Sequence, residues 1–143
     1  PRPAAAGGQL PDLVYVDLLA AEPPLEQRLR AAMAHFGRHL IDAGEGPPWE
    51  VDHHIVAFDP DALAAVEHQL AAGPGHRLYR GPSVMVDAAG VHTPVEELYW
   101  SETVALSMEP LKASIARVEF AASQWGAVYQ GLRLGQPAPA RTP

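Results

Sequence analysis

The stretch that decides the fold is EVDHHIVAF (50–58), which is followed at once by DPDALAAVEHQLAAGPG (59–75). Alternate residues of a strand point to opposite faces of a sheet. A strand over WEVDHHIVAF (49–58) therefore has two faces: one carries Val51, His53, Ile55 and Ala57, and the other carries Asp52, His54, Val56 and Phe58. Both faces become apolar toward the end, which is typical of a central strand.

The segment that follows predicts a helix. Asp59 stands where a side chain caps a helix, Pro60 suits the first helical position, and Gly73-Pro74-Gly75 ends the pattern. The pair predicts a strand that runs directly into a helix.

On the N-terminal side, LEQRLRAAMAHFGRHLIDAG (25–44) has apolar residues at three- and four-residue steps. This period predicts a helix that begins after Pro24 and ends at Gly44. Before it, LVYVDLL (13–19) fits either an edge strand or the start of a helix.

On the C-terminal side, residues 76–94 predict one or two short strands around Leu78-Tyr79 and Val84–Val86. VEELYWSETVALS (95–107) alternates as a long strand, 108–126 has helical periodicity, and AVYQGLRL (127–134) is a closing strand.

This order predicts an α+β fold. From residue 49 onward it runs strand, helix, strand, strand, helix, strand, which is the ferredoxin-like split βαβ arrangement. We expect a four-stranded, mostly antiparallel sheet with helices on one face, preceded by an extra N-terminal helix. Residues 13–134 form the single domain, and the Pro/Ala-rich ends 1–12 and 135–143 are predicted to be flexible.

Composition excludes several classes of protein. The net charge is -7, and Lys112 is the single lysine, so the basic stripe of a nucleic-acid binder is missing. The chain has no cysteine, which removes thiol chemistry and Cys-zinc sites. No run reaches the ~18 apolar residues of a membrane span. We expect a cytoplasmic, acidic protein without direct nucleic-acid or membrane binding, and with no cofactor.

Several motifs carry a resemblance to a known family. They are the leading helix with its Gly turn, VDHHIVAF followed by DPDALAAVEHQL, LYWSETVALS leading into a helix, and the closing VYQG. In these the chain resembles the ribonuclease E inhibitor RraB family, from about Leu25 to Leu132. The resemblance implies a small regulator that binds ribonuclease E or a related endoribonuclease by protein–protein contact, slows RNA decay, and is not itself an enzyme. Two features depart from the family: the chain ends in QPAPARTP rather than in an acidic tail, and LVYVDLL precedes the first helix.

The histidines are the first candidate site. His53 and His54 point to opposite faces, so one metal cannot readily take both, whereas Asp52 and His54 share a face. His35 and His39 stand at the i, i+4 spacing of zinc-binding helices, in HFGRH. A metal-dependent small enzyme that uses these two pairs is the alternative function. Because the ligand set is incomplete, no metal, cofactor or catalytic residue is assigned, and which of His53 and His54 is buried stays open.

Glu102 falls on the apolar face of its strand and is interpreted as a bulge or edge charge kept in water rather than a pocket acid of raised pKa. Trp100 and Trp125 are expected in the core. Tyr99, Ser101 and Thr103 share the opposite face of that strand, which helices on one side leave uncovered. They are the predicted partner surface, and an open sheet face of this kind also suits a homodimer that binds a ligand.

Overall fold

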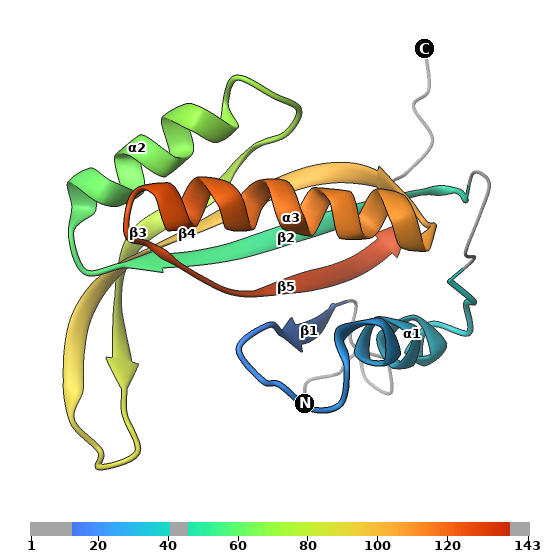
Figure 1. Ribbon diagram of the computed structural model, residues 1–143, viewed down its shortest axis with the longest axis horizontal. Coiled ribbons are helices and arrows are strands. Elements are labelled where there is room, and N and C mark those ends of the chain that lie inside the picture. Colours follow the sequence, from blue (N-terminus) through green and yellow to red (C-terminus); the bar gives the residue numbers. More distant parts are fainter. Residues whose placement is uncertain (1–12, 41–45, 138–143) are drawn as a thin grey trace, which may run out of the picture.

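The computed structural model of the chain describes residues 13–40 and 46–137. These residues form an α+β fold with one five-stranded antiparallel sheet and three helices (Figure 1). The elements in chain order are β1 (Val14–Asp17), α1 (Leu25–His35), β2 (Pro48–Ala57), α2 (Pro60–Leu70), β3 (His76–Val86), β4 (His92–Ala105), α3 (Met108–Gln124) and β5 (Val128–Pro137). The α+β class is confirmed.

The sheet has five strands rather than the predicted four, in the order β1-β5-β2-β4-β3. The additional strand is β1, which comes from the segment that fitted either a strand or a helix. It pairs with β5 from Val14↔Leu134 to Asp17↔Gly131. β5 also runs to Pro137, three residues beyond the predicted end of the domain. Residues 1–12 and 138–143, predicted as flexible tails, lie outside the described residues.

Helix α1 ends at His35, well before the predicted end at Gly44. The stop is Gly37, whose φ of 70° lies in the left-handed region. The amide of Gly37 donates to the Ala34 carbonyl, and the amide of Arg38 donates to the Met33 carbonyl. This pair of bonds is a Schellman motif, which closes a helix. His39 therefore lies outside the helix, and the predicted i, i+4 helical pair with His35 is wrong.

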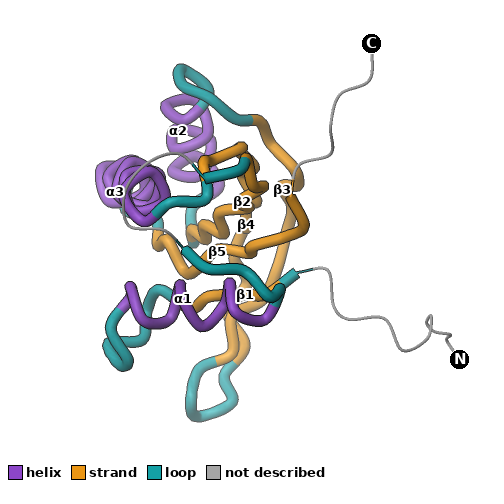
Figure 2. Tube along the Cα trace, turned by 90° about the vertical axis from the view of Figure 1, so that its right-hand side faces the viewer, coloured by secondary structure: helices purple, strands orange, loops and turns teal. Residues whose placement is uncertain are grey.

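All three helices pack on one face of the sheet (Figure 2). Residues from each of them join one hydrophobic cluster, for example Leu29, Leu63 and Leu111. His53 points into this core and is fully buried, whereas His54 points to the opposite face. None of the described helices is long and apolar enough to cross a membrane.

Trp100 is buried as predicted, but Trp125 is 48% exposed. Trp125 is the C-cap residue of α3, and its Nε1 donates to the side chain of Gln69 at 2.9 Å. The helical stripe had ended by that residue, so the prediction of a core position was wrong.

Strand β4 is longer than its neighbour β3. Their pairing ends at His76↔Ser101, while the pairing of β4 with β2 continues to Pro48↔Ala105. Among the described residues, Glu102–Ala105 therefore has a strand on one side only. The other end of the β3–β4 hairpin projects past the helices (Figure 1).

Candidate functional site

The helix-covered face of the sheet holds a buried polar network centred on His53. Its Nδ1 contacts the hydroxyl of Tyr129, and its Nε2 lies 3.0 Å from Ser114 Oγ and 3.5 Å from Glu102 Oε2. Glu102 in turn accepts hydrogen bonds from Nη2 of Arg117. Strands β2, β4 and β5 and helix α3 each contribute a member.

The hydrogen bonds fix the proton on His53. A carboxylate only accepts, so Nε2 carries the proton that faces Glu102 and Ser114, and Nδ1 accepts from Tyr129. Burial lowers the pKa of His53 although Glu102 raises it, so the ring is neutral. The Nε2 beside Ser114 therefore has no lone pair to take the serine proton. The arrangement is not the geometry of a serine triad, in which the base nitrogen faces the hydroxyl.

Glu102 is 5% exposed, so its interpretation as a charge kept in water is wrong. Burial raises the pKa of Glu102, but the hydrogen bonds from His53 and Arg117 outweigh burial and hold the pKa below its ordinary value. The buried carboxylate is stabilised by its ion pair with Arg117. This pairing is possible because α3, which carries the arginine, lies directly above β4.

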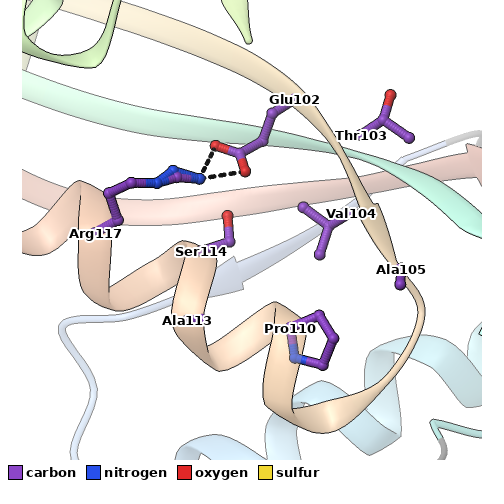
Figure 3. A pocket seen from close by; sticks show the side chains of 8 residues that line it. All are labelled: Glu102, Thr103, Val104, Ala105, Pro110, Ala113, Ser114 and Arg117. Carbon is purple, nitrogen blue, oxygen red and sulfur yellow. Dashed lines mark hydrogen bonds and ion pairs between the residues drawn. The ribbon is translucent and has the colours of Figure 1, made fainter. Parts of the chain in front are cut away.

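A cavity of about 420 Å³ lies between β4 and α3, beside this ion pair (Figure 3). Its floor is polar, with Glu102, Arg117 and Ser114, and its other lining is small and apolar, including Val104, Pro110 and Ala113. The cavity opens at the part of β4 that β3 does not cover.

The opposite face of the sheet carries a second cluster, which we call the open-face cluster: Tyr15, Asp52, His54, Glu97, Tyr99 and Arg133. Tyr15 Oη lies 2.9 Å from His54 Nδ1, and His54 Nε2 lies 2.9 Å from Glu97 Oε1. Because a carboxylate only accepts, the His54 Nε2 that faces Glu97 carries a proton. Burial, followed by the nearby charges of Tyr99 and Asp17, raises the pKa of Tyr15 to about 12, so its hydroxyl is a donor and not a base.

Aromatic stacking joins the two halves of the open-face cluster. The rings of His54 and Tyr99 stack with centroids 4.4 Å apart, and the Arg133 guanidinium lies 4.0 Å from the Tyr99 centroid. Arg133 Nη2 also donates to Asp52 at 3.3 Å, while Asp52 Oδ1 and Arg133 Nε are buried and find no hydrogen-bond partner among the described residues. The cluster is a patch of aromatic and charged groups on the sheet, linked by stacking and hydrogen bonds.

The three residues predicted as the partner surface share this face but differ in exposure. Thr103 is exposed, Tyr99 is half-buried within the open-face cluster, and Ser101 is buried at 3%. A partner on this face would touch Thr103 and the edge of Tyr99, and Ser101 would lie beneath it.

The predicted metal pairs do not converge. Asp52 and His54 share a face as expected, but each is engaged by a neighbour, Arg133 and Glu97 respectively. Within the part of the chain that the structure describes, no group of three or more possible ligands could hold a metal ion.

Reasoning from sequence missed most of both clusters. Tyr15, Glu97 and Arg133 sit on three different strands, and only the sheet order and register bring them to His54. Arg117 and Ser114 lie on or beside the inward-facing side of α3. They could have been found as polar residues beside its apolar stripe. Comparison with protein-family models, curated proteins and solved structures finds no match to this chain.

Proposed function

We propose that the chain is a small cytoplasmic regulator of the RraB type. In this proposal it binds ribonuclease E, or a related RNA-processing enzyme, and inhibits it by protein–protein contact. The motifs of the resemblance span α1 to β5, and the chain's acidic character fits a partner that handles RNA through basic segments.

The connectivity supports a ferredoxin-like core within the sheet. From β2 to β5 the elements run β, α, β, β, α, β, and the four strands lie in the order β5-β2-β4-β3. The first and second strands of this unit are separated by the third, as in a split βαβ fold. We infer that β1 and α1 are additions to this core.

The observation that carries the binding proposal is the open-face cluster. Tyr and Arg side chains that are held rigidly on a surface are the residue types that anchor protein interfaces. Tyr15 is 45% exposed, and its ring is held by His54 and by the close approach of Gly131, where a Cβ would lie 2.5 Å from Tyr15 Oη. Little side-chain entropy is lost when such a patch is covered.

Calorimetry with purified ribonuclease E tests the proposal. We expect a Kd of about 1 µM or tighter, weaker at moderate than at low salt. Excess chain should also slow digestion of an RNA substrate by the enzyme. Absence of binding at both salt concentrations would contradict the proposal.

Two arginine variants test which face is used. Arg133→Ala removes the cation beside Tyr99 and should weaken binding about tenfold, since a central interface arginine typically contributes more than 1 kcal/mol. Arg77→Ala is the matched control, because Arg77 is also an ion-paired arginine but lies on β3 beside α2 and pairs with Glu67. Equal losses from the two variants would argue against the open face.

A further inference from the structure

The uncovered edge of β4 has main-chain groups directed outward. The Leu106 amide donates to the carbonyl of Pro47, the residue before β2, at 2.9 Å. Residues of an antiparallel strand alternate the side to which their main-chain groups bond. Leu106, Val104 and Glu102 thus bond toward β2, and Thr103 and Ala105 direct theirs to the other side. The Ala105 carbonyl accepts from the amide of Ser107, so among the described residues the amide and carbonyl of Thr103 and the amide of Ala105 remain without a main-chain partner at this edge.

Cavities flank this edge on both faces of the sheet. The cavity of about 420 Å³ described above lies on the helix side, and another of about 340 Å³ lies on the opposite side, lined by Glu50, His76, Ser101 and others. Glu102 and Thr103 line both cavities. A strand added here would send alternate side chains into the two cavities, because side chains of a strand alternate between faces.

The chemistry of the two cavities differs. On the helix side, Arg117 is already paired with Glu102, and Val104, Pro110 and Ala113 offer apolar contact. On the opposite side, Glu50 is exposed and is the cross-strand neighbour of Thr103. A residue added opposite Thr103 would be two strands away from Glu50, with roughly 10 Å between the two backbones. The side chain of a lysine or arginine at that position and the side chain of Glu50 together span this distance.

We propose that the edge of β4 at Thr103–Ala105 accepts an extended, basic segment of a partner protein as an additional strand. The residue opposite Thr103 is lysine or arginine and reaches Glu50, and its two neighbours are apolar and enter the cavity beside α3. Main-chain hydrogen bonds supply affinity and the two cavities supply selectivity, as in other strand-addition complexes. The net charge of -7 favours a basic segment at longer range. This proposal does not depend on the identity of the partner or on the use of the open-face cluster.

The probe is a capped pentapeptide, Thr-Val-Lys-Val-Thr, titrated into the full ¹⁵N-labelled chain. We expect the amide resonances of Thr103 and Ala105 to shift among the most. A second peptide with glutamate in place of lysine should bind about tenfold more weakly, which corresponds to about 1.4 kcal/mol. A third peptide, N-methylated at the lysine, should show no saturable shift, since it cannot donate to the Thr103 carbonyl.

Variants of the chain provide the controls. Glu50→Lys should weaken binding of the lysine peptide about tenfold. Glu119→Lys makes the same change in net charge at an exposed residue of α3 and should leave binding unchanged. Thr103→Pro removes an outward amide that bonds no strand in the described sheet, and it should abolish binding. Equal effects of the two lysine variants, or unchanged binding of the N-methylated peptide, would overturn the proposal. The peptide result stands even if Thr103→Pro does not fold.

Discussion

At the scale of single residues, the two adjacent histidines show how strand geometry decides chemistry. His53 is sealed beneath α3 with Tyr129, Ser114 and Glu102, and His54 lies on the other face between Tyr15 and Glu97. The sequence predicts that the two rings diverge, because neighbours in a strand must. Which ring is buried depends on where the helices pack, which the strand alone does not encode.

Burial of neutral His53 predicts a dependence of stability on pH. Its pKa in the folded chain is below the ordinary 6.5, so below about pH 6.5 the unfolded chain binds a proton that the folded chain resists. The free energy of unfolding is therefore highest above this pH and falls as the pH drops below it. Thermal melts between about pH 5 and pH 8 should show this fall in the parent chain.

The control for this pH dependence is His53→Gln, which keeps hydrogen-bonding groups but has no proton to gain. The melting temperature of this variant should change less with pH than that of the parent chain between about pH 5 and pH 6.5. Glu102, whose pKa is lowered, loses its contribution only below its ordinary value of 4.5, outside this range. An undiminished slope in the variant would assign the effect to other groups.

The Glu102–Arg117 pair predicts a measurable coupling. Arg117 is 39% exposed and Glu102 is buried, so removing the arginine leaves a buried carboxylate with less compensation. We expect Arg117→Gln and Glu102→Gln each to cost about 1–3 kcal/mol, and the double variant to cost less than their sum. Urea unfolding of the four chains measures this coupling, and strictly additive losses would contradict it.

At the scale of elements, the end of α1 depends on one glycine. A non-glycine residue at φ 70° costs roughly 1 kcal/mol, so Gly37→Ala should destabilise the chain by about that amount. Nothing lies within 4 Å of an added Cβ, so the cost comes from the backbone alone. Gly37→Asn, which tolerates the left-handed region better, should lose less in the same urea titration. Equal losses for alanine and asparagine would point to another cause.

The elements that were predicted well are those whose signals are local. Asp59 accepts from the Asp61 amide as a capping residue, and β2 and α2 begin within one residue of their predicted starts. The errors came from signals that compete or act at long range. The apolar period of residues 25–44 continued past Gly37, and Val14–Asp17 is a strand only because β5 pairs with it. Both side-chain clusters depend on register between strands, which no local pattern in the sequence specifies.

The outer edge of β3 carries a proline, Pro82, which limits pairing with a further strand. The Asp87 amide bonds to the Val91 carbonyl, so by alternation Ser83 and Gly81 bond toward β4 and Pro82 faces the outer edge. Val84 and Val86, exposed beside it, make this edge prone to pairing. Pro82→Thr restores an outward amide and should increase self-association, measured by sedimentation velocity. Ser83→Thr, whose amide faces β4, is the matched control and should stay unchanged.

At the scale of the whole molecule, we expect the centre of the sheet to be more stable than its β1 edge. Within the described sheet, β2 pairs on both flanks with β4 and β5, whereas the four-residue β1 pairs with β5 alone. Native-state hydrogen exchange should therefore be orders of magnitude faster for amides of β1 than for those of β2, since edge segments open locally without global unfolding. Uniform exchange across the five strands would mean that β1 belongs to the same cooperative unit.

The pairing of Val14 with Leu134 also has a consequence for the order of assembly. A contact between residues this far apart closes the longest loop in the described chain. We expect such a contact to form late in folding, because closing the loop costs chain entropy before the contact stabilises the structure. During synthesis, β1 emerges from the ribosome before the other described strands, but β5, the strand that it pairs with, emerges last among them. Among the described strands, β1 is thus made first and placed last, and a chain stalled before residue 128 would present Val14–Asp17 to chaperones without its partner strand β5.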